Sequence, residues 1–231
     1  LMTYFPAYRY EQPYYLNTIY KPELEFSKDM KFSGYLENPI EVTSDFPKIV
    51  NWLMDVVLDS YLYKDKSSEV LNNVNLIISL ILRSKIKQDV RLGIGQRYEG
   101  AERIAIMSKK DNPTVYPSIF LMSSGEMALV AEFVELLKQA DALRKSIHDI
   151  SGIVLIDEVD KHLHIRLQKE VLPFLFAKFP NIQFIVTSHA PFLSLGLAEN
   201  NHIIKSTIFD MDQNGCRCEV ENNELYQEVY Q

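Results

Sequence analysis

Two adjacent carboxylates follow an apolar run in the second half of the chain. The run covers residues 153–156, and Asp157 and Glu158 come directly after it. A short continuous apolar run is typical of a parallel strand buried on both faces, and open α/β sheets bind ligands at the carboxyl ends of their strands. In that position Asp157 could hold Mg²⁺, and Glu158 could polarise a water molecule. A strand that ends in a solvated acidic turn is the alternative, and these residues alone leave both open.

A second expected buried strand, residues 182–186, ends in Thr187-Ser-His189. If the two strands are adjacent and parallel, His189 lies close to Glu158. A histidine there can bind a γ-phosphate or orient a water molecule. Taken alone, the histidine favours a simpler role, which is to satisfy a loop carbonyl.

A third group, Ser123-Ser124-Gly125-Glu126, precedes a helical pattern. Ser123 and Glu126 match the S-x-x-E capping box of a helix N-terminus. Backbone N–H groups that are free at such a terminus can also bind a phosphate. The two roles are compatible, so the cap does not argue against phosphate binding.

The helices and strands that would position these residues can be predicted from the pattern of apolar residues along the chain. We expect an irregular, aromatic-rich segment at residues 8–39, and a βαβ unit with a right-handed crossover around the helix at 161–178, which Pro173 should kink. On the helix at 46–63 the buried face should include Tyr61. The other predicted elements are a strand at 1–7, a helix at 67–85, short antiparallel strands at 89–120 and a long amphipathic helix at 127–147.

Composition indicates an ordinary globular protein. The 231 residues are 47% hydrophobic and 24% charged. The apolar runs are far shorter than the ~20 residues that span a bilayer, and no secretory leader is recognisable.

Cys216 and Cys218 are too close for a disulfide framework, which favours a reducing cytoplasm. The net charge of −7 argues against a surface-wide nucleic-acid footprint, although residues 83–110 hold a local excess of Lys and Arg. That excess is more simply a solvated surface.

Together the three groups resemble the ABC-type ATPases, and in particular their bacterial OLD/RecF-like branch. That branch carries the patterns LSSGE, hhhhDEhDxHLH and hhhTSHxPFL, where h is hydrophobic. This chain has MSSGE at 122–126, VLIDEVDKHLH at 154–164 and FIVTSHAPFL at 184–193. The segment YFPAYRYEQP at 4–13 is also similar to the branch. The resemblance covers the whole chain and is strongest over residues 120–195.

The resemblance implies a role for each residue. Asp157 would hold Mg²⁺, Glu158 would be the general base, and His189 would sense the γ-phosphate of ATP. The remaining implied nucleotide contacts come from the signature turn (residues 122–126) and the D-loop (residues 160–164) at a dimer seam; they are Ser123, Ser124, Gly125, Glu126, Asp160 and His164.

Departures from the usual pattern point away from transporters. Met122 stands where Leu is usual, Glu126 where transporters have Gln, and His164 where their D-loop has Asp. His162 and His164 could instead suggest a metal site, but the spacing fits D-loop surface better.

The Walker A motif G-x-x-x-x-G-K-[ST] does not occur in the sequence. Gly95 and Gly100 have the right separation, but Ala101 and Glu102 follow instead of Lys and Ser or Thr. In the family this motif lies upstream of the segments seen here, so we expect the natural protein to continue before Leu1. We also expect these residues alone to bind ATP weakly and to leave apolar sheet surface exposed.

We therefore predict an α/β fold with an ABC ATPase-like core, a helical lobe and short antiparallel strands. The predicted division is a core strand and entry to the lobe at 1–20, the lobe at 20–90, the short strands at 91–120, and at 121–231 the part with the signature turn, Asp157 and His189.

The predicted function is ATP binding and hydrolysis, with Mg²⁺, by a head-to-tail homodimer. The resemblance suggests bacterial anti-phage defence of the OLD, Septu or retron kind, with an effector nuclease as partner and nucleic acid as a further one. The sequence contains no nuclease pattern of its own. The alternatives are a RecF-like DNA repair ATPase and a degenerate module that no longer hydrolyses ATP.

Overall fold

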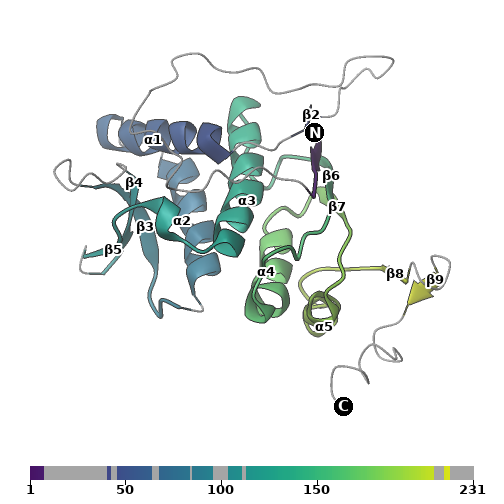
Figure 1. The fold of residues 1–231 in the computed structure, drawn as a ribbon. Helices are drawn as coiled ribbons and strands as arrows, with labels where there is room; N and C mark the ends of the chain where they lie inside the picture. The colour runs from purple at the N-terminus through teal and green to yellow at the C-terminus, as the bar shows by residue number, and fades with distance from the viewer. Residues whose placement is uncertain are drawn as a thin grey trace.

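The computed structural model describes residues 1–7, 41–42, 46–63, 68–83, 85–95, 104–110, 113–210 and 216–218 (Figure 1). The segment 8–39, predicted to be irregular, lies outside them. The described elements, in chain order, are β1 (Met2–Phe5), β2 (Glu41–Val42), α1 (Phe46–Leu62), α2 (Ser68–Leu82), β3 (Val90–Ile94), β4 (Ile104–Ser108), β5 (Thr114–Tyr116), η3 (Ile119–Leu121), α3 (Ser124–Ala142), β6 (Gly152–Ile156), η4 (Leu167–Val171), α4 (Leu172–Ala177), β7 (Ile182–Val186), α5 (Pro191–Glu199), β8 (Ile208–Asp210) and β9 (Cys216–Cys218).

A four-stranded parallel sheet with the order β2-β1-β6-β7 forms the centre of the site-bearing half. The strands align in register, so that Phe5 pairs with Ile156 and Ile156 with Val186. The carboxyl ends of β1, β6 and β7 therefore meet at one edge of the sheet. The predicted parallel pairing of β6 with β7 is confirmed, and with it the α/β class of the fold.

One face of this sheet is packed against helices. Val154 and Ile156 of β6 are buried. Phe184 of β7 packs against Phe176 of α4 and Phe133 of α3, with ring centroids 4.8 and 6.2 Å apart. Figure 1 shows α3 and α4 on the same side of the sheet. Such aromatic contacts add to the stabilisation from apolar burial.

The opposite face of the sheet is only partly covered. Ile185 of β7 is 50% exposed, and Tyr4, Ile153 and Leu155 are intermediate. The prediction that these strands are buried on both faces is wrong, because a strand is covered twice only where helices pack on both sides. The expectation of exposed apolar sheet surface is confirmed at Ile185.

The antiparallel sheet β3-β4-β5 and the helices α1 and α2 form the other half. The short antiparallel strands predicted at 89–120 are thus confirmed. One hydrophobic cluster runs through both halves and includes Ile49 of α1, Ile78 of α2 and Phe133 of α3. Tyr61 is 56% exposed, so its predicted place on the buried face of α1 is wrong, because the last turn of the helix runs past the core. The predicted division into four segments stays a prediction.

Between β6 and β7 the chain departs from the predicted single helix at 161–178. Residues 157–162 form turns, and helical structure begins only at Ile165. Residues 167–171 then form a π-helix, in which the N–H of Leu172 donates to the carbonyl oxygen of Leu167. Pro173 follows directly, and because a proline lacks the N–H that an α-helix needs, it disturbs the regular pattern there.

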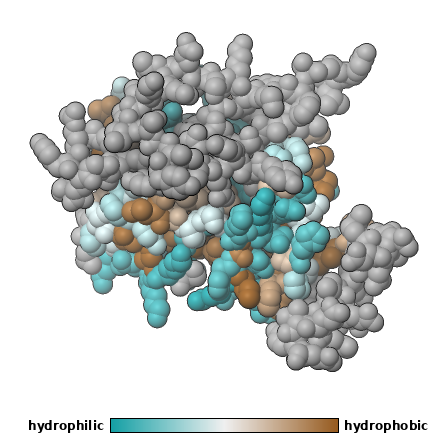
Figure 2. All heavy atoms as spheres, in the orientation of Figure 1, coloured by the Kyte–Doolittle hydropathy of each residue, from teal (hydrophilic) through white to brown (hydrophobic). Residues whose placement is uncertain are grey.

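The helix predicted at 127–147 also has other bounds, since α3 ends at Ala142. The sequence pattern missed the helix α5 and the strands β8 and β9. Figure 2 shows hydrophilic and apolar side chains side by side on the face in view. Arg166, just before η4, forms an ion pair with Glu170 at 3.4 Å. No helix among the described residues is both long and apolar enough to cross a membrane.

Candidate active site at the carboxyl edge of the parallel sheet

Thr187 links the two acidic residues after β6. Its hydroxyl donates to Oδ1 of Asp157 at 2.5 Å and accepts the backbone N–H of Glu158 at 2.8 Å. The N–H of Val159 donates to the carbonyl oxygen of Thr187 at 3.0 Å. The start of the loop after β6 is therefore fastened to the end of β7, as their parallel pairing requires.

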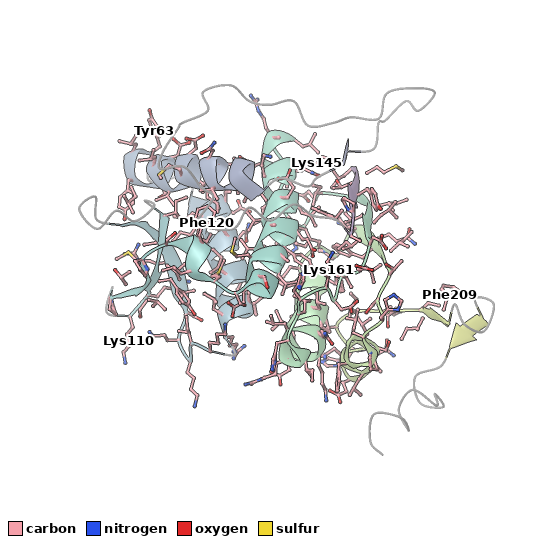
Figure 3. All side chains as sticks on the ribbon, in the orientation of Figure 1. Tyr63, Lys110, Phe120, Lys145, Lys161 and Phe209 are labelled. Carbon is pink, nitrogen blue, oxygen red and sulfur yellow. The ribbon has the colours of Figure 1, made fainter. Side chains whose placement is uncertain are left out.

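Glu158 has an uncommon backbone conformation. Its φ of 49° lies in the left-handed region, which costs a residue other than glycine of the order of 1 kcal/mol or more. Its carboxylate lies 4.0 Å from Nζ of Lys161, which is labelled in Figure 3. The same Nζ also donates to the carbonyl oxygen of Ala7 at 2.9 Å. The structure thus holds the candidate general base in a sharp turn, with a cation beside it.

His189 follows β7 at the same edge. Its backbone N–H donates to Oδ1 of Asp160 at 3.3 Å, and its side chain is exposed. This backbone contact places His189 beside the loop that carries Glu158, and the expected closeness of His189 to Glu158 itself stays a prediction. The imidazole has no described partner that would fix its orientation, so its sensing role stays a prediction.

The signature turn forms the predicted cap of α3. Ser123 is the N-cap residue, and its backbone N–H donates to Oε2 of Glu126 at 2.8 Å, which completes the capping box. Ser123 and Ser124 are exposed. Glu126 is 1% exposed and pairs with Lys85, Nζ to Oε1, at 2.7 Å. In this conformation the Glu126 carboxylate faces the protein, while the two serines face solvent.

Gly125 brings the signature turn into contact with the D-loop. A Cβ atom at Gly125 would lie 2.4 Å from the carbonyl oxygen of His162. That distance is too short for any side chain, so only glycine lets α3 approach so closely. His162 itself has a φ of 63°. The loop that begins with Asp157 therefore contacts both other motifs, one through Thr187 and one through Gly125.

The D-loop residues lie at the surface. His162 and His164 are exposed, and Nδ1 of His164 accepts the backbone N–H of Arg166 at 3.3 Å. Among the residues that the structure describes, no three His, Cys, Asp or Glu side chains are grouped as for a metal ion. A metal site built on the two histidines gains no support from the described part of the chain.

Alanine at Gly125 is expected to destabilise the fold. The added methyl group meets backbone of the D-loop rather than a flexible side chain, so α3 or the D-loop must shift, at a cost of about 1–3 kcal/mol. Thermal unfolding of the full-length protein measures it. The matched control is Ser124→Ala, because Ser124 is exposed and should change stability by no more than about 0.5 kcal/mol. Equal stability of the two variants would contradict the close contact.

Three contributors to the site were not recognised in the sequence. Thr187 stands inside a quoted motif, but its two hydrogen bonds depend on the register of β6 and β7. Lys161 is only three residues from Glu158, but its bond to the carbonyl oxygen of Ala7, after β1, is a tertiary contact. Lys85 reaches Glu126 of the signature turn through a tertiary contact as well, and the spacing of residues in the chain gives no signal for these two tertiary contacts.

Solved structures with a similar arrangement include a chain from work titled "Structural biochemistry of ATP-driven dimerization and DNA stimulated activation of SMC ATPases". It is 18% identical, with a TM-score of 0.43, and the match covers 74% of this chain and 98% of that one. A second is the SmcHead bound to the C-winged helix domain of ScpA, at 19% identity and a TM-score of 0.40, with 67% and 48% covered.

Two similar curated proteins are much longer than the segments that match. The Retron Ec83 probable ATPase of Escherichia coli is 40% identical over 84 residues, which are 35% of this chain and 16% of that protein. The Septu protein PtuA of Bacillus mycoides (strain KBAB4) is 32% identical over 140 residues, which are 58% of this chain and 17% of that protein.

A family model described as "AAA domain, putative AbiEii toxin, Type IV TA system" matches residues 53–195. The match includes the signature turn, the acidic pair after β6 and His189, and it covers more than half of the 231 residues. The resemblance to an ATPase family, first seen in the three motifs, is confirmed at this level: the chain belongs to the AAA domain family that this model describes.

Proposed function

We propose that this chain supplies the metal-binding acid, the general base and the γ-phosphate sensor of an ATPase site. One observation carries the proposal. The loop that begins with Asp157 and Glu158 is fastened to the strand end before His189, and it contacts the signature turn at Gly125. Three motifs that are separate in the sequence are thus adjacent at the edge where α/β sheets bind ligands.

Asp157 has the chemistry expected of a magnesium ligand. Its carboxylate stands at the end of β6, a strand that is buried on one face, and one of its oxygens accepts a hydrogen bond from the Thr187 hydroxyl. Mg²⁺ prefers carboxylate oxygen ligands and would supply charge neutralisation at the phosphates when bound. The role of Asp157 is to hold the ion at the strand end.

Glu158 is the proposed general base. Its side chain is 44% exposed, so a water molecule can reach the carboxylate. Glu158 stands in a left-handed turn, and Nζ of Lys161 lies 4.0 Å from its carboxylate. In the proposed reaction Glu158 accepts a proton from the attacking water, and His189 donates a hydrogen bond to the γ-phosphate.

We propose a second copy of the chain as the partner across the site. Ser123 and Ser124 are exposed at the N-terminus of α3, where the helix dipole favours an anion. The neighbouring D-loop, with Asp160 and His164, would lie at the same seam. In a head-to-tail dimer the signature turn of one copy would then face the nucleotide bound mainly by the other.

The biological role that we propose is bacterial anti-phage defence with an effector nuclease. The matches to a retron ATPase and a Septu protein support this role over DNA repair. Nucleic acid remains a proposed further partner, for which Lys87, Lys109 and Lys110 offer exposed positive charge.

Phosphate release from ATP tests the proposed activity. The purified full-length protein is assayed with Mg²⁺ and again with EDTA, and nucleotide binding is measured in parallel. Turnover that needs Mg²⁺ is the expected result. Binding without turnover would favour the degenerate module, and neither binding nor turnover would contradict the ATPase proposal.

A further inference from the structure

We infer that Thr187 is a positioning residue that sets the geometry of both acidic residues, an inference that rests on the proposed ATPase site. A hydroxyl can donate one hydrogen bond and accept others at the same time. Thr187 does both, because it donates to Oδ1 of Asp157 and accepts from the backbone N–H of Glu158. The side chain of this one residue, directly after β7, thus fixes two consecutive residues directly after β6.

The backbone around Thr187 makes this arrangement firm. Its N–H donates to the carbonyl oxygen of Ile156, and its carbonyl oxygen accepts the N–H of Val159, each at 3.0 Å. These two bonds continue the parallel pairing in which Ile156 faces Val186. The hydroxyl is therefore carried by a backbone that cannot move away without breaking the end of the sheet.

Each of the two hydroxyl bonds has its own consequence. The bond to Asp157 fixes the rotation of the carboxylate, and hence the direction in which it can offer oxygen to a cation. The bond to Glu158 holds an N–H in the left-handed turn at a φ of 49°. Without it, Glu158 can relax to an ordinary conformation, and its carboxylate is then aimed elsewhere.

Thr187 is exposed, so the hydroxyl is not needed to satisfy buried groups. In a valine variant, water can take over both hydrogen bonds, and the fold survives because the shape of the branched side chain is kept. Water satisfies the groups without fixing their directions. Loss of the hydroxyl should therefore affect catalysis far more than stability.

The test compares Thr187→Val, Thr187→Ser and Thr207→Val in the full-length protein. Serine keeps the hydroxyl, and Thr207 is an exposed threonine outside the site. Removal of an outer-shell partner typically costs 10–100-fold in metal affinity or activity. We expect about that loss in kcat for Thr187→Val, a higher Mg²⁺ concentration for half-maximal rate and a smaller change in KM for ATP. Thr187→Ser and Thr207→Val should stay near wild type.

Hydrogen exchange at the Glu158 amide gives a second readout that needs no ATP hydrolysis. Thr187→Val should lose the protection of this amide, and Thr187→Ser should keep it. Unchanged protection in the valine variant, or turnover equal to that of wild type, would overturn the positioning role. If wild type itself shows no turnover, the proposed function fails, and the exchange result alone decides whether Thr187 holds the turn.

Discussion

Glutamine in place of Glu158 is expected to lower the rate of ATP hydrolysis by about 10²–10⁴-fold, the usual contribution of a general base. Glutamine has nearly the same shape and can keep the turn that Thr187 holds, but its amide cannot accept the proton of the attacking water. Nucleotide should still bind, because the metal ligand Asp157 is unchanged. Phosphate release under single-turnover conditions, with binding of a fluorescent ATP analogue, separates the two effects.

Glu170→Gln is the matched control for this prediction. Glu170 is 54% exposed in its side chain and pairs only across the surface with Arg166, an arrangement that contributes little to stability. The control should hydrolyse ATP at the wild-type rate. Turnover near wild type in the Glu158 variant would remove Glu158 from the role of base and place that role on another group.

The location of the site was predictable because adjacent parallel strands end at the same edge of a sheet. Two short, mainly apolar segments with polar residues after each imply parallel strands whose carboxyl ends meet. The contact of Asp157 with Thr187 also needed the register of β6 with β7, which the structure supplies. The capping box at Ser123 was also predictable, since it depends on residues three positions apart.

Contacts that depend on tertiary packing were not predictable. The need for glycine at Gly125 arises from the carbonyl oxygen of His162, which lies far along the chain. The same holds for Glu126, whose place in the capping box was expected but whose burial against Lys85 was not. The local sequence of a capping box fixes where the helix begins. The residues that pack around this helix terminus are set by the tertiary fold.

The two-sided burial predicted for the strands failed for a different reason. An apolar run shows that both faces of a strand can be covered, and it does not show that they are. Ile185 points away from α3 and α4 and keeps half of its surface exposed. The π-helix at 167–171 was similarly unforeseen, because Pro173 predicts a disturbance but not the form that it takes.

Arginine at Ser123 is expected to abolish ATP-driven dimerisation while the monomer stays folded. Ser123 is exposed at the N-cap of α3, where the proposed dimer brings a partner's nucleotide against the signature turn. A long side chain there fills the space that the nucleotide needs, and overpacking of a close interface costs about 1–3 kcal/mol or more, which weakens the dimer by about fivefold to more than a hundredfold. Light scattering with a non-hydrolysable ATP analogue measures the loss.

Three controls separate this steric effect from its alternatives. Loss of the serine cap should lower stability by only about 1 kcal/mol, and a thermal unfolding curve checks that the Ser123→Arg monomer is folded. Ser206→Arg adds the same charge at an exposed position outside the site and should leave dimerisation unchanged. Ser123→Glu puts a negative charge beside the phosphate and should also block the dimer, which rules out an effect of arginine alone. An undiminished ATP-dependent dimer in both Ser123 variants would mean that the signature turn does not face the nucleotide, and the head-to-tail arrangement would have to be abandoned.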